Sequence, residues 1–294
     1  MCRLMAYVSA TGATIEDLLG PREFAGFRDL SRLHRDGWGM AWLTGADEPP
    51  LPDVGRITLR DGRLRATRSI LPAYEDSAFG ALAGWRLGEA GLLHLRWATS
   101  GLAVTESNTH PFLTRGWAFA HQGSIPSSDL LDSLLAPVWS ARREGTTDSE
   151  RYFLYLLQCI ETEGGLVAGA QHAVTEIIER CGPASLNAVL LSPSSLLVVH
   201  GLAGLEPPRE DILSAVATPE DVPLDHLEGY FRLRYRRRDG DLVVTSSGLA
   251  AEGWQALPDE SILHVELGTR ATSLHAFEGS PMPMPDAGLA GRRT

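Results

Sequence analysis

The 294-residue sequence contains no lysine: all 26 of its basic residues are arginine. The formal net charge is −11, and arginines gather only in RLRYRRR, from Arg232 to Arg238. This stretch alternates as a strand does and is followed by Asp239-Gly240, a dipeptide typical of hairpin turns. We therefore expect a solvated hairpin there. An acidic chain without a basic stripe argues against nucleic-acid binding.

Long apolar runs are also absent, and none approaches the roughly 20 residues that span a membrane. The start, MCRLMAYV, lacks the apolar core and cleavage site of a signal peptide, so we expect a cytoplasmic protein with no membrane association. The three cysteines, Cys2, Cys159 and Cys181, form neither a disulfide framework nor a zinc-binding set. We expect no metal and no other cofactor.

The expected elements are strands first, helices in the middle and strands again. Apolar and alternating runs predict early strands at residues 2–8, 36–43, 92–98 and 116–121, and a hairpin turn at Asp61-Gly62. Helical patterns cover residues 14–33, 73–88, 127–136, 148–163 and 166–181. Six short β runs follow between residues 186 and 277. This order suits an α+β fold with helices on antiparallel sheets. We expect one domain over residues 2–278 and a disordered Pro/Gly-rich tail over residues 279–294.

Cys2 is chemically unusual because of its position. An initiator methionine is normally removed before so small a residue, which would leave a thiol and a free α-amine on one residue. The reference pKa of an α-amine is about 7.7–8.0, so a partly neutral amine could take the thiol proton without a histidine. A cysteine at position 2 alone is weak support, and a retained Met1 would block this chemistry.

Three further segments carry polar side chains with two interpretations each. Arg96, Trp97 and Thr99 in LLHLRWATSG end a predicted strand, where the arginine could grip a carboxylate or form a structural ion pair. His110 in NTHPF precedes a proline and could order a loop or line a pocket. TTDSE precedes a helical run, so this segment could simply cap the helix, or Asp148 could in addition face a substrate ammonium group.

The stretch FAHQGSI contains two potential hydrogen-bond donors at a strand end, the side-chain amide of Gln122 and the backbone N–H of Gly123. Such a pair could stabilise an oxyanion or simply form a turn.

Taken in order, the N-terminal cysteine, HRDGWG, HLRWAT, NTHPF, HQG and TTDSE resemble the class II glutamine amidotransferases, which are N-terminal-nucleophile hydrolases. HRDGWG is similar to the HPDGWG segment of the stand-alone branch, which includes YafJ-like proteins, glutathione-degrading amidotransferases and the ergothioneine-pathway γ-glutamyl hydrolase. The resemblance spans roughly residues 2–265 and implies a four-layer αββα sandwich.

The resemblance also implies residue roles. Cys2 would attack the γ-carbonyl of a γ-glutamyl group, with its own α-amine as base. Arg96 and Thr99, in the segment that also holds Trp97, would bind the α-carboxylate, and Asp148 the α-ammonium. His110 matches a histidine that lines the glutamine pocket, and Gly123 would give its N–H to the oxyanion hole. Gln122 departs from the pattern, because the family usually has asparagine there.

These observations predict hydrolysis of a γ-glutamyl amide, from glutamine or a γ-glutamyl conjugate, through a Cys2 thioester. The alternatives are a glutaminase subunit that delivers ammonia to a separate synthase, another amide hydrolase of the superfamily, and a binding protein with a degenerate site because of Gln122. The leaving group is not identified, and its pocket is expected from loops at residues 45–55 and 202–230.

Overall fold

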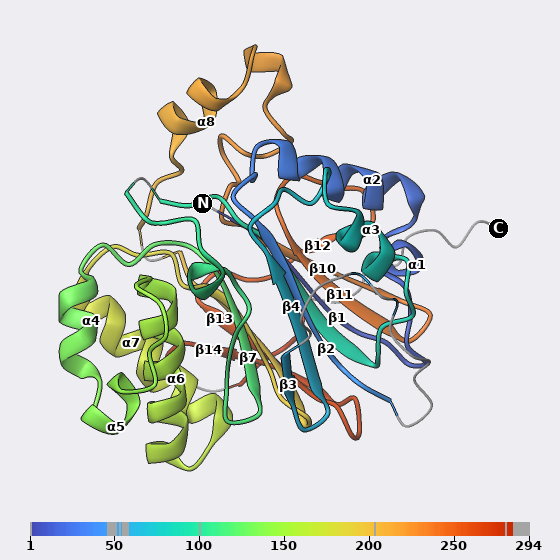
Figure 1. The fold of residues 1–294 in the computed structure, drawn as a ribbon. Coiled ribbons are helices and arrows are strands. Elements are labelled where there is room, and N and C mark those ends of the chain that lie inside the picture. Colours follow the sequence, from blue (N-terminus) through green and yellow to red (C-terminus); the bar gives the residue numbers. More distant parts are fainter. Residues whose placement is uncertain are drawn as a thin grey trace.

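The computed structural model describes residues 2–45, 52, 54, 59–99, 101–202, 204–279 and 281–284. Two antiparallel sheets stack face to face, and helices cover both outer faces (Figure 1). Three short helices, α1–α3, lie on the first sheet, and α4–α7 lie on the second (Figure 1). The α+β fold and its αββα layering are therefore confirmed.

The first sheet has eight strands in the spatial order β12-β10-β11-β1-β5-β2-β4-β3. They are β1 (Arg3–Val8), β2 (Trp38–Leu43), β3 (Leu59–Asp61), β4 (Leu64–Ser69), β5 (Ala90–Leu95), β10 (Leu233–Arg238), β11 (Asp241–Ser246) and β12 (Gln255–Ala256). The second sheet has seven strands in the order β15-β14-β13-β9-β8-β7-β6. They are β6 (Phe112–Thr114), β7 (Trp117–Gln122), β8 (Asn187–Leu191), β9 (Ser195–His200), β13 (Ser261–Glu266), β14 (Thr272–Ala276) and β15 (Pro281–Met282).

Side-chain alternation along the strands builds the layers. On β1, Leu4 and Ala6 face the second sheet, whereas Met5 and Tyr7 face the helices on the first sheet. On β7, Ala118 belongs to the layer between the sheets. β5 next to β1 and β8 next to β7 bury both faces, which is why they read as nearly continuous apolar runs.

The helices are α1 (Ile15–Leu19), α2 (Pro21–Asp29), α3 (Ser77–Ala83), α4 (Ser128–Leu134), α5 (Pro137–Ser140), α6 (Asp148–Glu163), α7 (Leu166–Cys181) and α8 (Arg209–Ala215). Single 3₁₀ turns occur at Leu30–Arg32, Glu106–Asn108 and Pro219–Asp221. The predicted helices over 148–163 and 166–181 match α6 and α7. Gly20 separates α1 from α2 and has a φ of 86°, a conformation that favours glycine.

One helix prediction was too long. The pattern over residues 73–88 forms only the seven-residue α3, because Asp76 caps it by accepting a hydrogen bond from the Ala78 N–H. The sequence patterns also missed α5 and α8. The predicted Arg-rich hairpin is confirmed as β10 and β11, with positive φ at Asp239 and Gly240.

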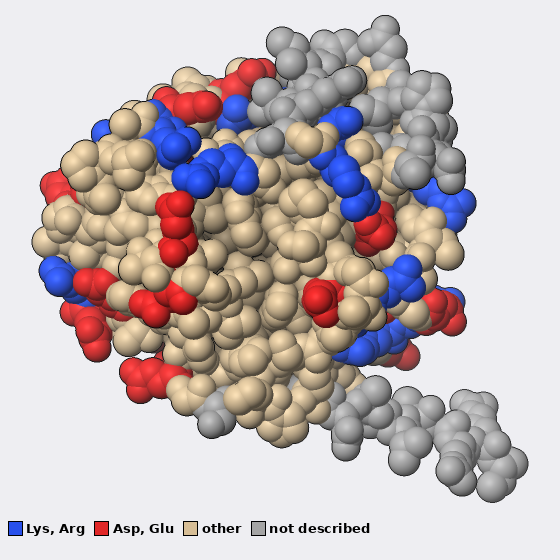
Figure 2. All heavy atoms as spheres, turned by 90° about the horizontal axis from the view of Figure 1, so that it is seen from below, with Lys and Arg blue, Asp and Glu red and all other residues tan. Residues whose placement is uncertain are grey.

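Pro281–Met282 pair with β14 within the stretch expected to be disordered, while residues 280 and 285–294 lie outside the described residues. In the described part of the chain, no helix is both long and apolar enough to cross a bilayer. Figure 2 views the sandwich from the end remote from α8, where acidic and basic side chains are interspersed around a broad uncharged area.

Candidate active site

The predicted nucleophile lies at the end of the first sheet where β1 begins. Leu4 pairs with His94 and Arg3 pairs with Leu95, so Cys2 and Arg96 continue the same two strands by one residue. Cys2 is buried, with 8% of its surface exposed, and its Sγ donates to the carbonyl of Trp97 at 3.7 Å. The thiol therefore lies directly against the RWAT segment.

Arg96 is buried between the ends of β1 and β2. Its Nη2 donates to the carbonyl of Ala103 at 3.1 Å and its Nη1 lies 3.5 Å from the carbonyl of Asp36. Both of these partners are neutral carbonyl groups. Desolvation lowers the pKa of Arg96, and the nearby Cys2 and Asp36 oppose that shift.

The HRDGWG segment holds this arrangement in place. The Asp36 carboxylate accepts a hydrogen bond from the Ala98 N–H at 2.8 Å, and the backbones of Asp36 and Gly37 bond to that of Arg96. His34 contacts His226 through their Nε2 atoms at 3.2 Å and lies edge-on to Trp97. The HRDGWG segment therefore fixes the position of the RWAT segment through these hydrogen bonds.

From the second sheet, β7 brings Gln122 and Gly123 to the same end. His94 on β5 ties the sheets together there, since its Nε2 lies 3.1 Å from the carbonyl of His121. A Cβ on Gly123 would lie 2.0 Å from the carbonyl oxygen of Ser185, so only glycine fits. No described residue accepts a hydrogen bond from the Gly123 N–H.

The Gln122 side chain is fully buried, and both the nitrogen and the oxygen of its amide form hydrogen bonds. Its Nε2 donates to the carbonyl of Tyr230 at 2.9 Å, and its Oε1 accepts from Asn187 Nδ2 at 3.4 Å. A carboxamide nitrogen carries two hydrogens, so one remains after the bond to Tyr230. The longer stem of glutamine thus reaches a backbone carbonyl in the segment before β10.

The Tyr230 carbonyl is a hub that the sequence patterns did not identify. It accepts hydrogen bonds from Gln122, from Arg3 Nη1 at 3.2 Å and from Ser247 Oγ at 3.0 Å. The Arg3 guanidinium also stacks on the Tyr230 ring at 3.9 Å. The donors come from three segments in both sheets, so the hub fixes the segment before β10 to the candidate site.

Asp148 is the first residue of α6, and Thr147 caps the helix by accepting from the Glu150 N–H. One oxygen of Asp148 accepts from the Ile125 N–H at 2.7 Å, which attaches the helix start to the chain just after Gln122-Gly123. The prediction that this segment caps a helix is therefore confirmed, with Thr147 as the capping residue. The carboxylate is half-buried at the end of the sandwich that holds the other candidates.

The buried histidines near the site are neutral. His121 accepts from Ser149 Oγ through Nδ1 and donates from Nε2 to the carbonyl of Ser185 at 2.7 Å, a structural arrangement. Desolvation lowers the pKa of His94 to about 3 and that of His110 well below its usual value. His110 packs on His94 with ring centroids 4.1 Å apart, but it has no hydrogen-bond partner among the described residues.

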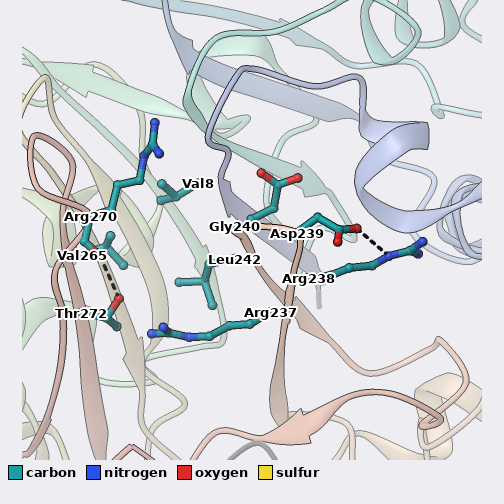
Figure 3. Close-up of a pocket in the computed structure, with 10 residues that line it drawn as sticks. Val8, Arg237, Arg238, Asp239, Gly240, Leu242, Val265, Arg270 and Thr272 are labelled. Carbon is teal, nitrogen blue, oxygen red and sulfur yellow. Dashed lines mark hydrogen bonds and ion pairs between the residues drawn. The ribbon is translucent and has the colours of Figure 1, made fainter.

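A groove of about 620 Å³ opens beside these residues. Trp97, Thr99 and Ser124 line one wall, and the segment around α8 forms the other. A different cavity of about 330 Å³ lies between the tips of the β10–β11 and β13–β14 hairpins (Figure 3). Val8, the last residue of β1, lines that cavity, so it is at the opposite end of the strand from Cys2.

The structure thus gathers Cys2, Arg96, Trp97, Gln122 and Gly123 at one end of the sandwich, with Asp148 attached to the same strand end. Thr99 lies on the groove wall. His110 lies deeper, against His94 in the interior. In the described part of the chain, no group of His, Cys, Asp and Glu is placed to hold a metal ion.

Comparisons with known proteins find similar sequences. The γ-glutamyl-hercynylcysteine sulfoxide hydrolase of Mycobacterium tuberculosis is 25% identical over 287 residues, which cover 95% of this chain and 99% of that protein. The glutamine–fructose-6-phosphate aminotransferase of Rhizobium leguminosarum is 37% identical over 92 residues, which cover 31% of this chain and only 15% of that protein.

Solved structures share the fold. A glutamine aminotransferase class-II domain protein from Silicibacter pomeroyi superposes with a TM-score of 0.57 at 19% identity, over 95% of this chain and all of the other. The glutamine phosphoribosylpyrophosphate amidotransferase of B. subtilis gives 0.58 at 14% identity, over 95% of this chain and half of the other. The family model for glutamine amidotransferases of class II matches residues 1–272, so the chain belongs to that family and is an amidohydrolase.

Proposed function

We propose that the protein hydrolyses a γ-glutamyl amide bond through a thioester on Cys2. The observation that carries the proposal is the placement of Cys2, whose buried thiol lies against the RWAT segment beside the Arg96 guanidinium. Membership of the family and the full-length similarity to a γ-glutamyl-hercynylcysteine sulfoxide hydrolase support a γ-glutamyl substrate.

In the proposed reaction, Met1 is removed and the freed α-amine of Cys2 takes the thiol proton. The Cys2 sulfur attacks the γ-carbonyl carbon, and a tetrahedral oxyanion forms. The carbon–nitrogen bond then breaks, and the α-amine passes its proton to the leaving amine. A water molecule hydrolyses the resulting glutamyl thioester, which releases glutamate and restores the thiol.

The buried histidines support the use of the α-amine as base. His121 is held by Ser149 and the carbonyl of Ser185, and burial keeps His94 and His110 neutral. None of the hydrogen bonds in the described residues joins an imidazole to Cys2. An internal amine on the nucleophile removes the need for one.

The oxyanion would be stabilised by the Gly123 N–H and by the second amide hydrogen of Gln122. The first donor is supported by the absence of a protein acceptor in the described structure and by the tight fit of a glycine there. The second is supported by the position of Gln122 at the same strand end, with one hydrogen left after the bond to Tyr230.

Arg96 and Asp148 would recognise the α-carboxylate and the α-ammonium group, with Thr99 as a further donor. Among the described residues, the hydrogen bonds of the Arg96 guanidinium go to neutral carbonyls. A guanidinium can bind a carboxylate through two parallel hydrogen bonds. Asp148 keeps an oxygen that the Ile125 N–H does not use. His110 would support this pocket from the interior rather than contact the substrate.

A second candidate function is that of a glutaminase that supplies ammonia to a separate synthase. The partial matches to larger amidotransferases favour it, since the chain spans only half of one and 15% of another. Both functions cleave a γ-glutamyl amide, but a glutaminase subunit acts on glutamine and releases ammonia, whereas a hydrolase of γ-glutamyl conjugates also releases larger amines. A screen of glutamine, glutathione and γ-glutamyl amines with detection of ammonia and released amine separates them, and undiminished hydrolysis by Cys2→Ala would exclude both.

A further inference from the structure

The groove beside the candidate nucleophile has two walls from distant parts of the chain. One wall comes from the residues around the proposed reaction site, and the other from the segment that contains α8, which stands above the upper end of the sandwich (Figure 1). The groove is lined by Arg35, Trp97, Ala98, Thr99, Ser124, Leu205, Glu206, Pro208, Asp211, Ser214 and Ala215. Cys2 itself does not line the groove, but its Sγ donates to the carbonyl of Trp97, which does. A molecule bound in the groove would therefore extend from the RWAT segment, next to the nucleophile, toward α8.

The α8 wall is a fixed surface. Ile212 is fully buried and packs with Tyr230 and Phe231, so α8 is anchored through the same tyrosine whose carbonyl holds Gln122. Asp211, Ser214 and Ala215 have the spacing of one helix face and all line the groove. The wall and the proposed oxyanion donors are therefore parts of one connected arrangement.

The groove is much larger than ammonia requires. Its volume is about 620 Å³, whereas a molecule of the size of water or ammonia occupies about 30 Å³. A groove of this size suits an organic ligand with several non-hydrogen atoms.

The charges of the lining favour a cation. Glu206 and Asp211 have no ion-pair partner among the described residues, and both lie on the α8 wall. Trp97 also lines the groove and packs against the apolar cluster of Ile212, Tyr230 and Phe231. An aromatic ring attracts cations. Arg35 is the one arginine among the lining residues, and it belongs to the HRDGWG segment, next to Asp36.

We infer that the preferred leaving group is a positively charged amine larger than ammonia, held between Trp97 and the carboxylates of Glu206 and Asp211. The inference rests on the proposed function, since it names the substrate class of the same site. It makes glutamine a poorer substrate than a γ-glutamyl conjugate whose amine carries a second, charged nitrogen.

The test uses three γ-glutamyl amides with the same four-methylene chain and different ends, namely ammonium (4-aminobutyl), methyl (pentyl) and carboxylate (4-carboxybutyl), together with glutamine. We expect wild-type kcat/KM to be highest for the ammonium amide and lowest for the carboxylate amide. Glu206→Gln and Asp211→Asn should each reduce the ratio of ammonium to methyl amide about 1.5- to 5-fold, as expected for exposed charge pairs. Added salt should reduce the same ratio.

Glu210→Gln is the matched control, because Glu210 is also in the first turn of α8 but does not line the groove. It should leave the ratio unchanged. The inference would be overturned by equal rates for the ammonium and methyl amides or by preference for the carboxylate amide. It would also be overturned if the ratio of ammonium to methyl amide were unchanged in the variant that combines Glu206→Gln with Asp211→Asn. In each case, hydrolysis of glutamine or of the methyl amide would still uphold the proposed function. Absence of Cys2-dependent hydrolysis of all four compounds would instead reject the proposed function itself.

Discussion

Replacement of Gln122 by alanine separates the catalytic role of this residue from its role in stability, at the position where the resemblance leads us to expect asparagine. The variant loses one buried methylene, about 0.8 kcal/mol, and the hydrogen bond to Tyr230, about 1 kcal/mol. No partner is orphaned, because the Tyr230 carbonyl keeps Arg3 and Ser247, and Asn187 keeps the carbonyl of Phe231. We expect a loss of about 2 kcal/mol, or roughly 4–8 °C in Tm.

The loss of transition-state stabilisation should be larger than this loss in the free energy of unfolding. If the second amide hydrogen of Gln122 donates to the oxyanion, its removal should slow turnover about 10²- to 10³-fold and leave KM nearly unchanged, since the oxyanion exists only in the transition state. Steady-state kinetics on a γ-glutamyl amide, with thermal unfolding of the same preparations, measure both quantities.

Asn187→Ala is the control for this variant. Asn187 lies opposite Gln122 in the β7–β8 ladder and bonds to Gly201 and Phe231. Its loss leaves both of those backbone groups without that partner, so the stability cost should be at least as large, but kcat should fall less than about tenfold by the same transition-state reasoning. A Gln122→Ala enzyme with kcat within about threefold of wild type would refute the donor role.

Three further predictions concern neighbouring residues. Gly123→Ala places a Cβ 2.0 Å from the Ser185 carbonyl oxygen, so the strand end must move. We expect a lower Tm and turnover slowed by about two orders of magnitude or more, whereas wild-type kinetics would contradict the donor role of Gly123. Asp148→Asn keeps an acceptor for the Ile125 N–H but removes the charge, so kcat/KM should fall about tenfold or more for γ-glutamyl amides, while an analogue without the α-amine should bind both proteins equally. The lowered pKa of His94, about 3 in the folded state against 6.5 unfolded, means that the unfolded chain binds the extra proton, so stability is lost as pH falls from 6.5 toward 3. His94→Gln should make the urea-unfolding free energy less pH-dependent in that window, by up to about 1.4 kcal/mol per pH unit, and parallel pH curves would show that His94 does not titrate in this way.

The sequence predicted those features that depend on local patterns. Residues 148–163 and 166–181 carry long helical periodicity, and they form α6 and α7 with the predicted bounds. Such runs also predicted Arg96 and Gly123 near strand ends, although β5 ends at Leu95, three residues before the predicted end. These motifs therefore predicted that the candidate site residues lie at strand ends.

Features built from contacts between distant residues could not be predicted. The Tyr230 hub joins Gln122 to a residue 108 positions later and Arg3 to one 227 positions later. The helix α8 was missed because it is short and polar and is stabilised by Ile212 against Tyr230 and Phe231 rather than by its own periodicity. The groove wall therefore appears only in three dimensions.

The proposed function requires that Cys2 is the nucleophile and becomes the N-terminus. Its most direct test is the intact mass of the protein, with peptide mapping, after reaction with the glutamine-like electrophile 6-diazo-5-oxo-norleucine. We expect a chain without Met1 that carries a single adduct on Cys2 and none on Cys159 or Cys181. A chain that retains Met1 or an adduct on another residue, in a preparation that hydrolyses γ-glutamyl amides, would contradict it.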